Sequence, residues 1–544
     1  MFRFFSRLFH RQTEHVTSAA ALLGVAALLS RFVGLLRDRL LASHFGAGPI
    51  LDAYYAAFRW PDALYNLLIV GALSAGFIPV LTECLEQEGQ ASAARFSGRV
   101  LSLTAYVMMS VSLLLIVGAG VIVPWTVSGF SEAQVSETIM LTRIMALSPL
   151  LLGLSAVMGG VLQATNRFIA FAIAPMLYNV GIIFGILCLA PFWGIRGVAF
   201  GVIFGACFHL FAQTRAVLQA KALIVDKPLF REPRLRHMVA LMGPRTIGLA
   251  MTQLNLIVLL GFASSLSDGS VSVLVFANNV QSVPLGLVGI SFAVAALPAL
   301  SRAATVRDTQ EATRLVMTLA RQVLVLVVPM AAWLMLLRAQ VVRLLLGQGA
   351  FDWDDTIRTA ALVGWFAISL PAQALVPLLA RVWYAYKNTW IPLGVGVCAE
   401  LVNVSAALFF RAQYGVTGLA MAFSLAAIVQ GVGLAWFLRR RGLIERAPLW
   451  PGGWKMLVAL GASLVVGYAV RQGVGTIFPL RLTWQVALQG GASGLTCLLV
   501  YGGTAHALRL AEWEAITEVF HRKWRQRLQD VTHVDTTESN AVGM

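Results

Sequence analysis

Gly194-Ile-Arg-Gly197-Val-Ala199 and Gly415-Val-Thr-Gly418-Leu-Ala420 are two versions of one short motif, about 220 residues apart. Three further matches follow in the same order at nearly the same spacing: Ser128-Gly-Phe130-Ser131 with Gly349-Ala-Phe351-Asp352, Asn166 with Asn388, and Pro79 with Pro298. A single match could arise by chance, because Gly and Pro are common at helix ends. Four matches at one spacing indicate that the chain contains two similar halves.

The composition shows what kind of structure is repeated. Of the 544 residues, 58% are hydrophobic and 12% are charged, and the mean hydropathy is +0.77. Soluble domains carry about 25% charged residues. Apolar runs of about 20 residues, long enough to cross a bilayer, recur from one end of the chain to the other. The composition therefore predicts an integral membrane protein without a large soluble domain.

We expect about 14 transmembrane helices, six in each half and two more at the end. Their expected ranges are 17–43, 53–82, 97–123, 138–162, 169–191, 195–219, 238–262, 270–299, 315–337, 357–383, 390–410, 415–438, 453–473 and 484–509. An even number of spans gives both repeats the same orientation, and transporters of that design hold their substrate between the halves. The expected fold is therefore all-α and membrane-integral, with two parallel six-helix repeats and two C-terminal helices.

These spans divide the chain into six expected segments. In order, they are an N-terminal amphipathic segment at 1–16, a first six-helix lobe at 17–220, a cytoplasmic linker at 221–237, a second six-helix lobe at 238–440, two additional transmembrane helices at 453–510, and a cytoplasmic tail at 511–544. The last two spans have no partner in the repeat, so we interpret them as an appendage to the two lobes.

The net charge of +16 lies mostly on one side of the expected spans. Basic residues gather after the even-numbered spans, for example Lys221, Arg234 and Arg440, whereas the opposite loops hold few. This asymmetry follows the positive-inside rule, which predicts a multi-pass protein of the bacterial inner membrane with both termini in the cytoplasm. Because the membrane accounts for the charge, we expect membrane lipids as partners and no nucleic acid.

No catalytic or metal-binding pattern is present in the sequence. The cysteines are isolated, the lysines lie in no Walker A motif and the histidines are scattered. A glycosyltransferase or ligase would need an outward catalytic site, for which Asp352, Asp354 and Asp355 are the candidates; we interpret them as helix-capping residues. We therefore expect a transporter, with no cofactor other than a monovalent coupling cation.

Ionisable residues concentrate in the first two spans, where each costs on the order of 3 kcal/mol to insert. Arg31 and Arg37 belong to the first span, and Asp52 and Arg59 lie at the start of the second. A guanidinium group can bind a phosphate through two hydrogen bonds, so these residues suit a diphosphate. Arg245, at the start of the seventh span, is a further candidate. The alternative is that the arginines only anchor helix ends at the interface.

A second group of polar residues, mostly uncharged amides, lies in the second half of the chain. Glu400 and Asn403 are three residues apart and share a helix face, and Asn255 lies in the seventh span. Oxygen ligands of this kind suit a hard cation. Hydrogen bonding between helices is the competing interpretation.

Residues 30–79 resemble the opening of the MurJ/MviN family of lipid II flippases. The matching elements are Ser30-Arg31, Gly34, Arg37-Asp38, Phe45-Gly46-Ala47-Gly48, Asp52-Ala53-Tyr54, Ala57-Phe58-Arg59, Pro61, Gly71-Ala72, Ser74, Phe77 and Pro79. Later matches are Leu162-Gln163-Ala164 with Asn166-Arg167-Phe168, Gly347-Gln348-Gly349-Ala350-Phe351, and Tyr384-Ala385 with Asn388-Thr389. The resemblance extends over nearly the whole chain.

The resemblance implies a fourteen-span fold of the multidrug/oligosaccharidyl-lipid/polysaccharide exporter superfamily. It also implies transport of undecaprenyl-diphosphate-linked peptidoglycan precursor from the cytoplasmic to the outer leaflet, with Arg31, Arg37, Asp52 and Arg59 as functional residues. The two additional helices would form the groove that receives the lipid tail.

Two departures from the family pattern leave the substrate open. Tyr65 and Asn66 stand where the family usually has an arginine in its second span, and Asn278 and Asn279 replace an acidic-arginine pair in the eighth. The alternative substrate is another polyprenyl-diphosphate-linked oligosaccharide. The coupling ion and the oligomeric state are not encoded in any motif of the sequence.

Overall fold

The computed structural model describes residues 16–67, 73–227, 232–290, 292, 300, 302, 309–443, 452–478 and 482–518. In these residues the chain is helical and contains no strand, which confirms the all-α fold. The chain forms two compact units. Unit 1 comprises Met1–Asn279, Leu345–Leu362 and Glu400–Phe423, and unit 2 comprises Val280–Leu344, Val363–Ala399 and Ser424–Met544. The lobe boundaries expected from the repeat stay a prediction.

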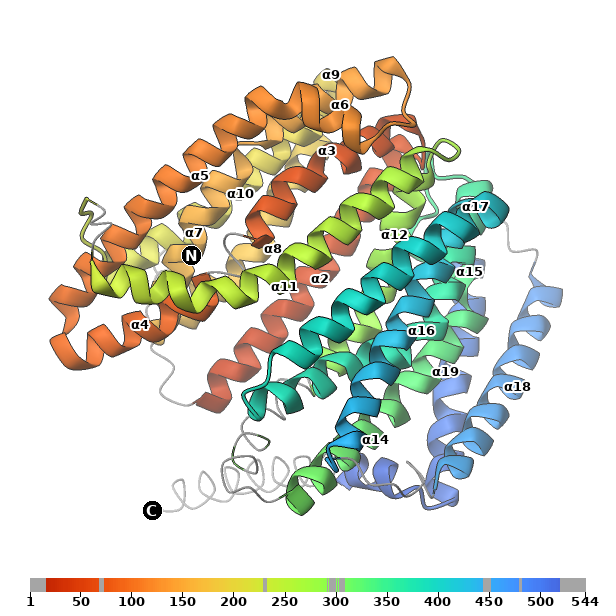
Figure 1. Cartoon of the computed structure of the whole chain (residues 1–544). Coiled ribbons are helices and arrows are strands. Elements are labelled where there is room, and N and C mark those ends of the chain that lie inside the picture. Colours follow the sequence, from red (N-terminus) through yellow and green to blue (C-terminus); the bar gives the residue numbers. More distant parts are fainter. Residues whose placement is uncertain are drawn as a thin grey trace, which may run out of the picture. The chain divides into compact units, whose positions relative to one another are not determined.

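Unit 1 holds the helices of the first repeat and the first helix of the second (Figure 1). Its helices are α2 (Val16–Phe45), α3 (Pro49–Tyr65), α4 (Leu73–Glu88), α5 (Gln90–Thr126), α6 (Glu132–Met145), α7 (Ser148–Ala164), α8 (Phe168–Phe184), α9 (Ala190–Trp193), α10 (Ile195–Gln219) and α11 (Pro233–Ser264). A π-helical turn, η2 (Gly185–Leu189), joins α8 to α9. Helix α10 packs against α7 and α8, and α2 packs against α8.

Small residues let α8 and α10 approach backbone to backbone. A Cβ atom added to Gly181 would lie 2.2 Å from the Cα of Gly205. Such contacts between small residues drive helix association where water provides no hydrophobic force. Around α4, α5 and α7, the core of unit 1 is built from large apolar side chains such as Phe77, Phe96 and Leu162, each at most 1% exposed.

Unit 2 contains the remaining helices of the second repeat and the C-terminal pair. Its elements include η3 (Leu285–Ile290), α14 (Thr309–Leu336), most of α15 (Arg338–Leu346), α18 (Gly453–Ile477) and α19 (Thr483–Ala507). Helices α18 and α19 lie side by side (Figure 1), where Ser493 Oγ donates to the Gly467 carbonyl at 2.6 Å. The Tyr501 hydroxyl donates to the Val325 carbonyl at 2.9 Å and so fixes α19 to α14.

Three helices pass from one unit to the other. These are α12 (Ser270–Pro284), α16 (Trp353–Ala385) and α17 (Trp390–Arg440). Gly415 interrupts α17 with φ 57° and ψ −137°, so α17 consists of two helices separated by a kink. These two helices correspond to the expected spans 390–410 and 415–438.

The backbone supports the internal repeat and corrects one of its matches. Gly194 has φ 55° and ψ −138°, nearly the values of Gly415, so the paired motifs form the same turn. Asn166 and Lys387 both have φ 57°, a left-handed conformation that few non-glycine residues adopt. The equivalent of Asn166 is therefore Lys387, and the match with Asn388 was one residue out of register. Pro298 lies outside the described residues.

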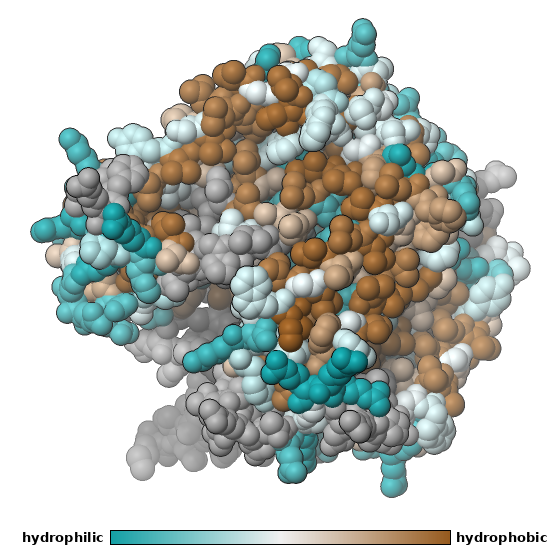
Figure 2. Space-filling view, viewed as in Figure 1, coloured by the Kyte–Doolittle hydropathy of each residue, from teal (hydrophilic) through white to brown (hydrophobic). Residues whose placement is uncertain are grey.

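Nine helices within the described ranges are long and apolar enough to cross a membrane. They do not include α2 and α3, which carry the charged residues discussed below, and the number of 14 spans stays a prediction. Apolar side chains are freely exposed on these helices: Val121 of α5 is 78% exposed and Trp125 is 88% exposed. Figure 2 shows broad areas of such hydrophobic surface on the viewed face. A surface of this kind suits contact with lipid tails.

Candidate functional site

Arg37 is held near the end of α2 by hydrogen bonds to two side chains. Its Nε and Nη2 atoms donate to Asp38 Oδ1 at 3.0 and 2.8 Å, and its Nη1 donates to Asn179 Oδ1 of α8 at 2.9 Å. The other oxygen of Asp38 accepts from Asn279 Nδ2 of α12 at 2.8 Å. The Arg37 side chain remains 21% exposed, whereas Asp38 is 4% exposed. Three helices thus orient one guanidinium group within a nearly buried network.

Arg59 on α3 has one N–H group that no other described residue accepts from. Its Nη1 lies 3.4 Å from Asp62 Oδ2, its Nη2 donates to Gln253 Oε1 of α11, and its Nε is buried without a partner among the described residues. Asp62 is within electrostatic range of both Arg59 and Arg37. We call Arg37, Asp38, Arg59 and Asp62 the arginine cluster. Its two positive charges are balanced by two negative ones, and it can offer guanidinium donors to an anion.

The other two predicted arginines are less closely defined. Arg31 is half-buried on α2, about 9 Å along the helix axis from Arg37 at 1.5 Å per residue. Arg245 belongs to α11, but its side chain lies outside the described part of the chain.

Asp52 lies apart from the arginine cluster and caps α12. Its carboxylate accepts from the Gly269 amide at 2.7 Å, the Ser272 amide at 2.7 Å and the Ser272 hydroxyl at 2.6 Å, and the residue is only 2% exposed. A carboxylate at a helix N-terminus satisfies orphan N–H groups and faces the positive end of the helix dipole. Asp52 therefore joins the first turn of α3 to the start of the second repeat's second helix.

Sequence reasoning missed three partners of the arginine cluster. Neither Asn179 nor Gln253 was predicted as a site residue, and Asn279 was interpreted as the loss of a charge. The structure instead makes Asn279 the hydrogen-bond partner of Asp38. The available signal was an amide side chain inside an otherwise apolar helix, where such groups need partners.

The predicted cation ligands lie together. Asn403 Nδ2 donates to Asn255 Oδ1 at 3.1 Å, and Glu400 is hydrogen-bonded to Asn403. Asn403 is 1% exposed, and its Oδ1 is buried without a partner in the part of the chain described. An unpaired amide oxygen next to a carboxylate is the donor set that a hard cation prefers.

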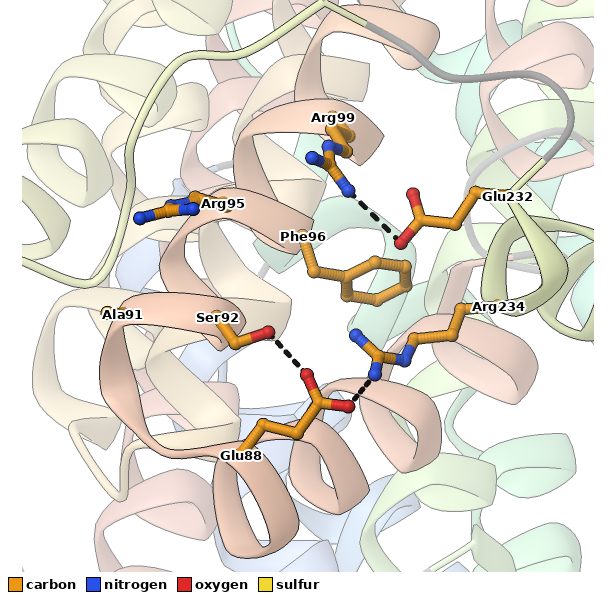
Figure 3. Close-up of a pocket in the computed structure, with 8 residues that line it drawn as sticks. All are labelled: Glu88, Ala91, Ser92, Arg95, Phe96, Arg99, Glu232 and Arg234. Carbon is orange, nitrogen blue, oxygen red and sulfur yellow. Dashed lines mark hydrogen bonds and ion pairs between the residues drawn. The ribbon is translucent and has the colours of Figure 1, made fainter.

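A second polar feature of unit 1 is an open pocket of about 320 Å³ between α4, α5 and the start of α11. Figure 3 shows the Phe96 side chain between two ion pairs, with Arg99 facing Glu232 and Arg234 facing Glu88. The Arg99 Nη1 and Glu232 Oε1 atoms are 3.3 Å apart. Arg99 also binds Asp226 at 2.9 Å. These ion pairs connect α4 and α5 to the linker, and the pocket lining carries three arginines against two glutamates.

Comparison with known proteins identifies the family. A family model described as lipid II flippase MurJ matches residues 41–486. The chain belongs to the MurJ family of lipid II flippases. This confirms the resemblance seen in residues 30–79, and with the long apolar helices it establishes a multi-pass membrane protein of a transporter family.

Individual relatives cover most of this MurJ-family chain. A probable lipid II flippase of Rhizobium tropici is 29% identical over 491 residues, which are 88% of this chain and 90% of the relative. A lipid II flippase of Burkholderia cenocepacia is 30% identical over 447 residues, 81% of this chain and 86% of the relative.

Solved structures share the fold. A MurJ flippase in an inward closed conformation has a TM-score of 0.74 at 23% identity and covers 90% of this chain and 99% of its own. An inward-facing multidrug resistance transporter of the MATE family has a TM-score of 0.68 at 13% identity and covers 79% of this chain and all of its own. The MurJ-family chain therefore has the transporter fold that both groups share.

Proposed function

We propose that this protein moves undecaprenyl-diphosphate-linked peptidoglycan precursor, lipid II, from the cytoplasmic to the outer leaflet by alternating access. The observation that supports it is the arginine cluster, in which Arg37 and Arg59 are oriented by amide side chains from both repeats. The family membership supplies the substrate class, because curated relatives over most of the chain are lipid II flippases.

A diphosphate would bind the arginine cluster by competing with the carboxylates. Each guanidinium group offers planar N–H donors that match phosphate oxygens. Arg59 Nε is buried and ready to donate, and Arg37 would exchange one Asp38 contact for a phosphate oxygen. Arg31, on α2 as well, would provide a third positive group on the path of the lipid headgroup.

A different lipid-linked oligosaccharide is the second candidate substrate. It is favoured by Tyr65, Asn66, Asn278 and Asn279, which reduce the charge available near the arginine cluster. Asn66 is hydrogen-bonded to Asp62, so neutral amides take part in the site itself. A headgroup with fewer ionised peptide groups than lipid II would suit such a site.

We further propose that Glu400, Asn403 and Asn255 bind the monovalent cation that couples transport. Their support is the contact among the three and the unpaired Asn403 Oδ1. For the orientation, we propose the bacterial inner membrane with both termini in the cytoplasm, because the positive residues follow the even-numbered spans.

Rescue of a bacterium depleted of its own lipid II flippase tests the proposed function. Wild-type protein should restore growth and the appearance of lipid II in the outer leaflet, measured with an added enzyme or antibiotic that acts only on externally exposed lipid II. Normal membrane abundance without rescue would reject lipid II. Transport of a different polyprenyl-diphosphate oligosaccharide in the same cells would then establish the second candidate.

A further inference from the structure

Two loops at one end of unit 1, one from each repeat, share a hydrogen-bonded turn and a helix cap, and they differ in that Gly349 of the second has a φ of 62°. They are the Phe130 loop, residues 127–131, and the Phe351 loop, residues 348–352. The Phe130 amide donates to the Val127 carbonyl at 3.0 Å, and the Phe351 amide donates to the Gln348 carbonyl at 3.2 Å. The residue after each phenylalanine caps the next helix: Ser131 Oγ accepts from the Gln134 amide at 3.3 Å, and Asp352 Oδ1 accepts from the Asp355 amide at 2.9 Å.

Each loop rests against the other repeat. The Ala350 amide, in the Phe351 loop, donates to the Ser43 carbonyl at 2.8 Å near the end of α2. A Cβ atom added to Gly129, in the Phe130 loop, would lie 2.4 Å from the Ser264 carbonyl oxygen at the end of α11. Helices α2 and α11 are the first helices of their repeats, and Ser43 and Ser264 occupy equivalent positions in them. The two contacts are therefore reciprocal.

Neither contact leaves space for a side chain. A Cβ atom on Gly349 would lie 2.3 Å from the Ser43 carbonyl oxygen, and one on Gly129 would lie 2.3 Å from the Ser265 Cα. Real Cβ atoms do not approach backbone this closely, so both loops require glycine where they touch. Two further bonds join the end of α2 and the residues after it to the second repeat: the Asp355 carboxylate accepts from the Ala47 amide at 3.0 Å, and Arg39 donates to Gln348 at 3.0 and 3.1 Å.

We propose that the two loops form a reciprocal clasp, a pair of equivalent contacts that holds this end of the protein closed and must open at both places in each transport cycle. A movement that separates the repeats at this end withdraws each loop from the other repeat's first helix, so neither contact can persist alone. The inference rests on the proposed alternating-access transport. It adds the two loops that would keep this end closed while the opposite end is open. Phe351, 1% exposed, and Phe276, 1% exposed, pack edge to face behind the clasp with ring centroids 5.8 Å apart.

A reversible cross-link tests the clasp in the full-length protein. Arg39, near the end of α2, donates to Gln348 of the Phe351 loop at 3.0 and 3.1 Å, and both side chains are accessible, so cysteines at these two positions can be joined without disturbing the glycine contacts. The double variant Arg39→Cys with Gln348→Cys, in a background without the native cysteines, should be cross-linked by a short bis-methanethiosulfonate reagent. Flipping should then fall at least about tenfold and return on reduction. Neither cross-linking nor reduction should change the flipping rate of the two single variants.

The clasp is rejected if the cross-linked protein flips lipid as fast as the same protein after reduction, or if the folded double variant forms no cross-link. Failure of the proposed function has a different signature, because there the background protein itself would not flip lipid II under either condition. Cross-linking is read on a gel and needs no substrate, so the geometry is tested even in that case.

Glycine substitution tests the other half of the clasp. Gly129→Ala should force the Phe130 loop away from α11 and favour the open end. Its matched control is Gly48→Ala, a turn glycine with φ −142° and no atom within 4 Å of an added Cβ. Thr356→Cys, at a fully buried position just after the Phe351 loop, reports the opening through its reaction with a membrane-impermeant maleimide added outside.

Gly129→Ala should raise the labelling rate at position 356 at least about fivefold, and Gly48→Ala should leave it unchanged. Equal labelling in Gly129→Ala and the control would overturn the clasp. If Gly129→Ala does not reach the membrane, the cross-link between positions 39 and 348 decides, since it joins the opposite contact and leaves Gly129 in place.

Discussion

At the scale of single residues, the proposed site depends on how a few buried side chains are oriented. Arg37 contacts Asp38 and Asn179, and Arg59 contacts Asp62 and Gln253. A charged group inside a membrane protein needs such partners, because an unpaired charge in a low-dielectric region is costly. The network therefore both permits the arginines to lie there and sets the direction in which their donors point.

Arg37→Ala should weaken substrate binding about ten- to a hundredfold, since a hydrogen bond to an ionised group contributes roughly 1.5–3 kcal/mol. Arg37→Lys should remain defective, because lysine offers a point charge in place of a planar fork. Flipping at matched membrane abundance is the measurement, and Arg196→Ala, an exposed arginine paired with Glu137, is the control. Full transport by an Arg31→Ala, Arg37→Ala double variant would show that these arginines are only interfacial anchors.

Glu400→Gln should reduce the dependence of transport on the coupling cation, because it removes the charged ligand while keeping the shape of the side chain. Flipping is measured in vesicles over a series of Na⁺ and K⁺ concentrations. Glu137→Gln, in an exposed ion pair, should behave as wild type. An unchanged cation dependence in Glu400→Gln would favour hydrogen bonding between helices as the role of this group.

At the scale of helices, polar side chains at helix ends and in the linker determine which elements are joined. The Asp52 carboxylate joins α3 to the first turn of α12 through three hydrogen bonds, while Asp226 joins the linker to α5 through Arg99. The Ile224 amide also donates to the Ala94 carbonyl at 3.0 Å, and Ser102 Oγ to the Asp226 carbonyl at 2.7 Å. The linker segment before Lys227 is thus bound along α5.

Asp52→Ala should destabilise the protein more than Ser272→Ala. The first change removes all three bonds to α12 and leaves buried N–H groups unpaired, whereas the second removes one hydroxyl. A lost helix cap costs about 0.5–2 kcal/mol, so we expect Asp52→Ala to lower the thermal midpoint of the purified protein by several degrees. Equal midpoints for the two variants would mean that water replaces the cap at no cost.

The linker contact should depend on pH only in acid. The hydrogen bond from Arg99 lowers the pKa of Asp226 below its ordinary value. The bound linker is therefore favoured at all pH values above about 3.9 and loses this contribution as the pH falls further. Asp226→Asn should lose this contribution at pH 7, measured as several-fold faster trypsin cleavage after Lys221, because Pro228 blocks cleavage after Lys227. Cleavage at the wild-type rate would show that the backbone contacts of the linker suffice.

At the scale of the whole molecule, the periodicity and composition of the sequence predicted the architecture well. They did not predict which side chains in the site are hydrogen-bonded to each other. Long apolar runs specify membrane helices by length alone, so the all-α fold followed directly. The partners of Arg37 and Asp38 come from α8 and α12, respectively, more than a hundred residues away in sequence, and no local pattern encodes such contacts. The one-residue error at Asn166 arose for a related reason, since backbone conformation and not residue type defines that equivalence.

The orientation proposed for the membrane can be tested at two exposed positions. Val225→Cys, 75% exposed in the linker, should resist an impermeant maleimide added to intact cells. Ser267→Cys, exposed in the turn between α11 and α12, should react. Ala222 is unsuitable as a probe because it is only 6% exposed. Labelling at position 225 and protection at 267 would invert the topology.

The charge balance of the arginine cluster has an electrical consequence. Arg37 and Arg59 are offset by Asp38 and Asp62, so a rocking movement carries almost no net charge of these four side chains through the transmembrane field. The voltage then acts mainly on the cargo. A diphosphate leaving a cytoplasm held at negative potential gains about 2.3 kcal/mol per charge for each 100 mV that it crosses. A flippase with a neutral carrier site can therefore use the membrane potential through its substrate alone. Cations that move inward with the empty carrier would carry charge in the same direction as the diphosphate that moves outward.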